Sequence, residues 1–79
     1  MTFEQEFKTL KPYDPIQSGI ITTKGYTFFF TAGHGYLVVP KTDKNAHIAK
    51  RICKYGFIGN LAYYLEEDCE AGNFITAIN

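Results

Sequence analysis

The stretch GIITTKGYTFFFTAGHGYLVVP, residues 19–40, decides the fold. The sequence changes here to a period of two, and β-branched and aromatic residues dominate, as half-buried strands require. Lys24-Gly25 and the glycine-containing residues 32–35 interrupt the alternation as turns, and Pro40 ends it. The pattern therefore predicts an antiparallel meander with strands at residues 19–23, 26–31 and 35–40. One face of the predicted sheet should carry Tyr26, Phe28 and Phe30, and the other face should carry Phe29.

A short helix is predicted before the meander. Thr2 and Gln5 fit a capping box, in which each side chain bonds the backbone N–H of the other residue. Apolar residues then follow at helical spacing as far as Leu10. Pro12 and Pro15 break this pattern, because a proline has no N–H to donate and biases the preceding residue toward an extended conformation. The segment around the two prolines is therefore predicted to be a connection.

A second helix is predicted after the meander, because the apolar period changes from two to 3.6 beyond Pro40. It should cover residues 43–55, with Asp43 at the N-cap and Gly56 as a left-handed stop. Its narrow apolar stripe consists of Ile48, Ala49, Ile52 and Cys53.

The C-terminal part predicts one more strand and one more helix. Residues 61–66 alternate weakly, and apolar residues recur at helical spacing between Cys69 and Ile78, with Asp68 as the expected N-cap. Together these elements predict a single α+β domain over residues 1–79, in which a small antiparallel sheet of three to four strands packs against two to three short helices. Such a small domain is expected to have little room for a pocket of about 300 Å³ or more.

The charges are balanced overall but segregated along the chain. The formal net charge is zero, which argues against direct binding of nucleic acid. Residues 8–54 hold all eight bases and only two acids, whereas residues 55–79 hold four acids and no base. This asymmetry predicts a dipolar surface, which would steer encounters with another protein.

The two cysteines and the hydropathy pattern bear on location and on metal binding. Cys53 and Cys69 are too few for a disulfide scaffold, and they lack the paired spacing of a zinc site. The N-terminus lacks the basic start and apolar run of a signal peptide, and no apolar run approaches the roughly 18 residues of a membrane-spanning helix. We therefore expect a cytoplasmic protein with reduced thiols, without a membrane segment, a metal or a cofactor.

Half of all the acids lie in the segment YYLEEDCE, residues 63–70. Like charges this close repel by roughly 1 kcal/mol per neighbouring pair even in water. If Asp68 caps the last helix, the acids surround a helix N-terminus, where the macrodipole favours negative charge. The alternative is a partner-binding surface of acids with aromatic anchors. Its predicted residues are Glu66, Glu67, Asp68 and Glu70 with Tyr63 and Tyr64.

His34 has the most enzyme-like setting in the sequence, because it lies between two glycines and histidine titrates near neutrality. No catalytic residues are assigned, and His34 is included among the predicted partner-binding residues. One alternative is a small enzyme or ligand-binding domain centred on His34 with Asp68 or Cys69. Another is a structural homodimer in which surplus aromatics such as Phe29 and Phe57 pair across a two-fold axis.

The pattern HGYLVVP at residues 34–40, followed by YYLEEDCEAG at residues 63–72, resembles an uncharacterised family of small phage- and plasmid-encoded proteins. The resemblance covers roughly residues 25–75 and carries no established activity. It implies a mobile-element context, in which short single-domain proteins often inhibit host defence, anti-CRISPR proteins among them. The favoured interpretation is therefore a non-enzymatic protein that binds a protein partner, such as a nucleic-acid-binding host complex, in the host cytoplasm.

Overall fold

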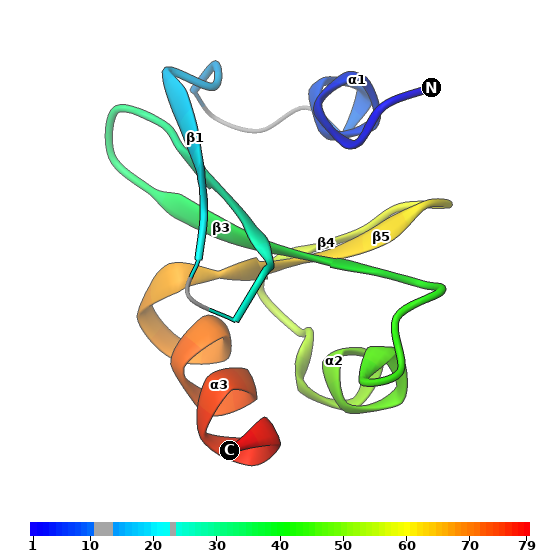
Figure 1. Cartoon of the computed structure of the whole chain (residues 1–79). Helices are drawn as coiled ribbons and strands as arrows, with labels where there is room; N and C mark the ends of the chain where they lie inside the picture. Colours follow the sequence, from blue (N-terminus) through cyan, green and yellow to red (C-terminus); the bar gives the residue numbers. More distant parts are fainter. Residues whose placement is uncertain (11–13, 23) are drawn as a thin grey trace.

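The fold is a five-stranded antiparallel sheet with helices on both faces (Figure 1). The computed structural model describes residues 1–10, 14–22 and 24–79. The strand order across the sheet is β1-β2-β3-β5-β4, which confirms the predicted α+β class. The elements in chain order are α1 (Phe3–Thr9), β1 (Ser18–Ile21), β2 (Thr27–Phe30), β3 (Gly35–Pro40), α2 (Ala46–Ile52), β4 (Phe57–Ile58), β5 (Ala62–Glu66), a π-helical turn (Glu67–Ala71) and α3 (Gly72–Ile78).

Helix α1 covers one face of the sheet through Phe7, which is fully buried. The capping box that begins this helix is present, since Gln5 N donates to Thr2 Oγ1 and Thr2 N donates to Gln5 Oε1. The Phe7 ring centroid lies 4.9 to 5.7 Å from those of Phe29, Tyr36, Phe57 and Tyr64. This aromatic cluster joins α1 to the sheet.

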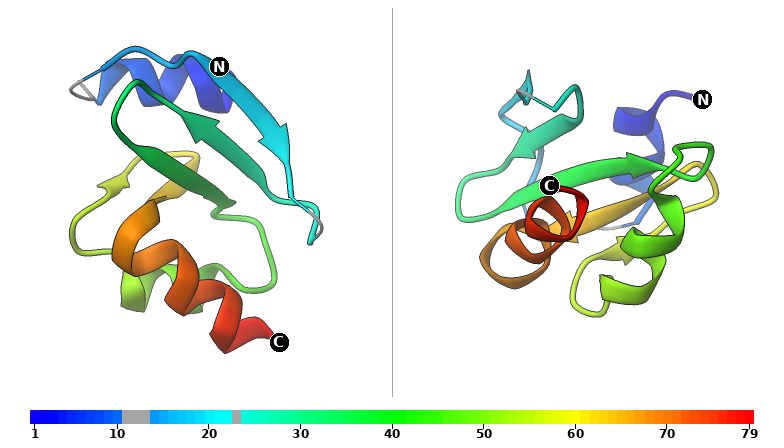
Figure 2. Two further views of the ribbon diagram at one scale, coloured as in Figure 1. Left: turned by 90° about the vertical axis from the view of Figure 1, so that its left-hand side faces the viewer. Right: turned by 60° about the horizontal axis from the view of Figure 1, so that its bottom comes forward.

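Helices α2 and α3 cover the opposite face, as both views of Figure 2 show. The predicted stripe of α2 packs there, with Ala49 fully buried, and so does Phe74 of α3. Tyr26 and Phe28 belong to this side of the sheet, whereas Phe29 belongs to the α1 side. The period of two in β2 therefore assigned these aromatics to the correct faces.

The predicted start of α2 is wrong, because Asp43 has another role. Its carboxylate accepts hydrogen bonds from the Tyr26 hydroxyl and from Asn45 N, both at 2.9 Å. These bonds fix the connection between β3 and α2 in a turn, and the helix begins three residues later, at Ala46. Asn45 takes the N-cap position, and its side-chain amide donates to the Tyr26 hydroxyl instead of capping the helix.

Gly56 is not the predicted left-handed stop of α2. Among the described glycines, Gly25 is the one with a positive φ, of 87°. Gly56 instead lies against the backbone oxygen of Tyr64, where a Cβ would collide. It follows that glycine is needed here because the chain entering β4 passes very close to β5.

The remaining differences from the predicted elements are local. Strand β4 was not predicted, because two residues are too few to show a period. The predicted strand at residues 19–23 is observed as Ser18–Ile21, and Thr23 lies outside the described residues. Most of the predicted proline-containing connection, residues 11–13, is also outside them.

Replacing Ile52 by alanine is expected to lower the free energy of unfolding by about 2 kcal/mol, because its half-buried side chain packs against the core cluster between α2, α3 and the sheet. Lys50→Ala on the exposed side of the same helix is the matched control, with an expected loss below about 0.5 kcal/mol. Chemical denaturation measures both. Equal losses would show that the wrong face of α2 has been assigned to the core.

Candidate functional site

The four clustered acids have different environments, and Glu70 is an internal structural residue. It is buried, and its carboxylate accepts hydrogen bonds from the backbone N–H groups of Lys54, Tyr55, Gly56 and Glu66. These bonds tie the connection between α2 and β4 to the end of β5. A partner cannot reach this carboxylate in the folded protein, so Glu70 does not belong to an accessible acidic surface.

Glu66 performs the capping role that was predicted for Asp68. The Glu66 carboxylate accepts from Asp68 N at 3.2 Å, at the start of the π-helical turn, so the prediction of Asp68 as the N-cap is wrong. Glu66 is half-buried, whereas Glu67, Asp68 and Cys69 are exposed. The acidic surface that a partner can contact is therefore Glu67 and Asp68, with part of Glu66.

Neither predicted aromatic anchor projects from the surface. Tyr64 is fully buried, and its hydroxyl donates to Glu6 at 2.8 Å. Burial, together with this hydrogen bond and the Glu6 charge, raises the pKa of the Tyr64 hydroxyl. Tyr63 is buried on the opposite face, and the Lys41 ammonium lies 5.4 Å from its ring centroid. Both tyrosines therefore stabilise the sheet and are not available as anchors.

His34 is exposed in the turn between β2 and β3. This turn is closed by Thr31, whose backbone N–H donates to His34 O at 2.9 Å and whose hydroxyl oxygen accepts from His34 N at 3.1 Å. Because Tyr36 pairs with Glu66 in the sheet, His34 lies at the same end of the sheet as the acidic segment. The structure thus brings these two predicted regions to one end of the molecule.

The buried thiol of Cys53 does not have the properties of a nucleophile. Cys53 is buried, and burial, with a smaller effect of the Glu70 charge, raises the pKa of its thiol to about 11. Its Sγ donates to Phe57 O at 3.7 Å. Residues 1–10, 14–22 and 24–79 contain no group of three His, Cys, Asp or Glu side chains that could hold a metal. Among them there is also no helix with the length and apolarity needed to cross a bilayer.

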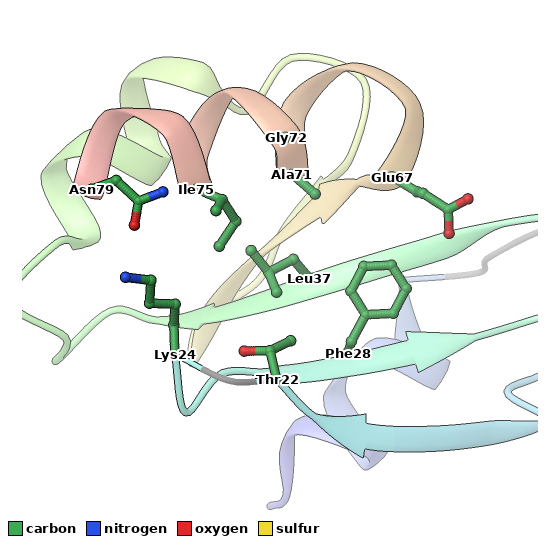
Figure 3. Close-up of a pocket in the computed structure, with 9 residues that line it drawn as sticks. All are labelled: Thr22, Lys24, Phe28, Leu37, Glu67, Ala71, Gly72, Ile75 and Asn79. Atoms are coloured by element: carbon green, nitrogen blue, oxygen red, sulfur yellow. The ribbon is translucent and has the colours of Figure 1, made fainter.

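A groove lies between α3 and strands β2 and β3 (Figure 3). Its volume is about 570 Å³, which is more than the little room that was expected in a domain of this size. Phe28, Leu37 and Ile75 line its middle, Glu67 lies at one end, and Lys24 lies at the other beside Asn79. The groove therefore has an apolar centre between an anionic and a cationic end.

The anionic end of the groove depends on Gly35. A Cβ at this position would collide with the Glu67 carboxylate and with the Phe28 ring. The glycine thus lets the acidic side chain and the aromatic ring approach the start of β3 together. This arrangement joins Glu67 of the predicted acidic surface to Phe28, which was not among the predicted site residues.

The apolar surface continues from the groove onto the hairpin of β1 and β2. Phe30 lies next to Phe28, with ring centroids 4.8 Å apart, and both side chains are only half-buried. Ile20, which pairs with Phe28 across the two strands, is 51% exposed. Helix α2 packs over β3 and β5 instead, so this part of the sheet face lacks a covering helix among the described residues.

The two aromatics that were expected to pair across a dimer axis lie in the core on the α1 side. Phe29 is buried there, and Phe57 packs against Phe7 and Tyr36 with ring centroids 5.7 Å apart. Phe29 therefore offers little surface to a second copy, whereas Phe57 is only half-buried. The alternative of a homodimer that pairs such aromatics stays a hypothesis.

Comparisons with family models, with curated proteins and with solved structures give no match to this chain. The resemblance drawn from residues 34–40 and 63–72 remains a hypothesis.

Proposed function

We propose that this protein is a non-enzymatic domain that binds a protein partner through the groove beside α3, with Glu67 and Asp68 at its acidic end. The observation that carries the proposal is the half-buried Phe28, which is held between an apolar wall and an exposed carboxylate. A few residues, often large aromatics that become fully desolvated in the complex, contribute most of the binding energy in many protein interfaces. Such a surface is also costly to leave in contact with water.

The charges at the two ends specify the chemistry of the partner. Glu67 favours a lysine or arginine at its end, and Lys24 favours a carboxylate at the other. The segment between them should be apolar, because it covers Phe28, Leu37 and Ile75. The apolar surface extends beyond the groove to Phe30 and Ile20, and this size favours a protein segment over a small molecule, most of whose surface would be enclosed.

The narrower proposal is that the partner belongs to a host defence complex in the cytoplasm and that binding inhibits it. This step rests on the resemblance to mobile-element proteins and on the basic character of surfaces that hold nucleic acid. Glu67 and Asp68 would meet such a basic surface at its rim, while the groove supplies the apolar contact. The neutral net charge fits local contact better than imitation of DNA over the whole surface.

The test uses a partner that is captured from the host cell with the tagged protein and then purified. Phe28→Ala is expected to weaken its affinity by about thirtyfold or more, as for a buried aromatic anchor. The double variant Glu67→Gln with Asp68→Asn should weaken it by about fivefold and reduce its salt dependence, because rim charges are screened by salt. Thermal melts of each variant establish that the fold is intact.

The matched control is Glu4→Gln, which removes an exposed acid from α1, on the opposite face of the sheet. It is expected to leave the affinity unchanged. Full binding by a folded Phe28→Ala variant would overturn the proposal. Binding that is insensitive to the groove variants but is lost with His34→Ala would favour the alternative site around His34.

A further inference from the structure

The sheet has two edge strands, and they differ in how well they are protected against pairing with a strand of another molecule. Strand β4 forms one edge and contains only Phe57–Ile58, so it offers few backbone groups. Strand β1, Ser18–Ile21, forms the other and is the outermost strand in the left view of Figure 2. All four of its residues are exposed. Residues 16–22 contain neither a charge nor a proline, the usual means by which proteins block pairing at an edge.

The register of β1 on β2 shows which of its backbone groups point outward. Thr22 N donates to Tyr26 O, so Thr22 and Tyr26 form a hydrogen-bonded pair. Ile20, two residues before Thr22, pairs with Phe28. Hydrogen-bonded positions alternate along an antiparallel strand, so Ser18 and Ile20 direct their N–H and C=O groups toward β2. Gly19 and Ile21 direct theirs away from the sheet. This edge therefore presents two donors and two acceptors in line.

We propose that two copies of this chain associate by antiparallel pairing of β1 with β1, around a two-fold axis at Ile20. In this register Gly19 of each copy lies opposite Ile21 of the other, and each of these two pairs exchanges two hydrogen bonds. The same four groups are satisfied on both copies, as a two-fold interface requires. The zero net charge adds no overall repulsion between the copies.

The side chains fit the same register. Ile21 is 67% exposed and would lie over Gly19 of the second copy, where no side chain competes for the space above the buried Phe29 ring. The two Ile20 side chains would face each other at a non-hydrogen-bonded position on the α3 side, next to Phe28. These contacts favour a second copy over an unrelated strand, because the bulky and the small residue of this edge complement each other by symmetry.

The pairing does not depend on the proposed binding function. It extends the sheet within its plane, so the groove stays open, and the two-fold axis places both grooves on the same face of the joined sheet. Four-residue strands bury little area, at the low end of specific interfaces. The dimer is therefore expected to be weak and to depend on concentration.

Sedimentation equilibrium up to about 1 mM tests the association. The unaltered protein is expected to approach the mass of a dimer, and Ile21→Lys to remain a monomer, because each copy would place a charge in the apolar contact over the second copy's Gly19. Ile58→Lys is the matched control, since Ile58 is 56% exposed on the opposite edge, and it should still dimerise. A monomeric unaltered protein at the highest concentration, or equal loss in both variants, would overturn the proposal.

Cross-linking tests the register separately. In a Cys69→Ser background, Ile20→Cys is expected to form a disulfide between copies at least about tenfold faster than Ile58→Cys, because directly opposed non-hydrogen-bonded positions bring two Cβ atoms within bonding reach. Ile21→Cys should be slow, because glycine lies opposite. Equal rates for the three variants would exclude this pairing even if the protein dimerises by another surface.

Discussion

Replacing Glu70 by alanine is expected to lower the free energy of unfolding by about 3 to 5 kcal/mol, although Glu70 forms no salt bridge among the described residues. Its carboxylate accepts four backbone N–H groups from two segments in partly buried hydrogen bonds, and the variant removes the acceptor from all four donors. A domain of 79 residues typically has about 4 to 12 kcal/mol in total. The loss should therefore be visible as partial unfolding at room temperature.

Glu70→Gln removes the charge of Glu70 and nearly keeps the shape of its side chain, so it shows how much of the stability loss is due to the charge. It retains one carbonyl oxygen but presents an NH₂ group to backbone donors, so it should recover only part of the loss. The control is Glu67→Gln, an exposed neighbour in the same cluster, with an expected change below about 0.5 kcal/mol. Denaturant unfolding followed by circular dichroism measures all three variants. Similar small losses at both positions would contradict the structural role of Glu70.

This result also determines how the acidic surface can be studied. A variant that removes Glu70 together with Glu66 and Glu67 would lose stability, so any loss of binding would be uninterpretable. Glu66 has the same drawback to a smaller degree, because its carboxylate caps the π-helical turn. Glu67 and Asp68 are the acids whose charge can be removed while the described hydrogen bonds stay intact.

The elements that could be predicted from sequence are those with local causes. The capping box of α1 depends on Thr2 and Gln5 alone, and the faces of β2 follow from strict alternation along the strand. Local rules failed where a distant group competes. Asp43 is not the N-cap of α2, because its carboxylate accepts a hydrogen bond from the Tyr26 hydroxyl, 17 positions away. Gly56 serves a close contact with Tyr64 instead of a left-handed turn.

The candidate site was predicted only in part, for the same reason. The sequence presents Glu66, Glu67, Asp68 and Glu70 as equivalent charges, whereas burial distinguishes them in the fold. The partners of Glu70 in the loop before β4 lie 14 to 16 positions away, so no local pattern reveals them. The groove depends on how α3 lies across β2 and β3, which neither period nor composition determines. Its central residue, Phe28, has no sequence signal apart from its place on a strand.

Glu6 was missed entirely, and it carries the second large expected effect. In sequence it is one acid of a short helix, yet it is buried, and its carboxylate accepts from Asn60 N, Leu61 N and the Tyr64 hydroxyl. These hydrogen bonds join α1 to the turn between β4 and β5. Replacing Glu6 by alanine is expected to lower the free energy of unfolding by about 3 to 4 kcal/mol at neutral pH. Glu4→Ala, an exposed acid in the same helix, should cost below about 0.5 kcal/mol.

The effect of Glu6 should depend on pH. Burial alone would raise the pKa of this carboxyl, but the hydrogen bonds from Tyr64, Leu61 and Asn60 outweigh it, so the folded-state pKa lies below the ordinary 4.5. A group whose pKa is lowered on folding contributes fully above its unfolded-state pKa, and this contribution is lost as the pH falls through the folded-state value. The stability difference between the unaltered protein and Glu6→Gln should therefore be constant near neutrality and shrink below about pH 4.5. Urea unfolding at about pH 7 and about pH 3 measures it. A difference that is the same at both values, or that grows in acid, would show that the Glu6 carboxylate does not hold α1 to the β4–β5 turn as a charged acceptor.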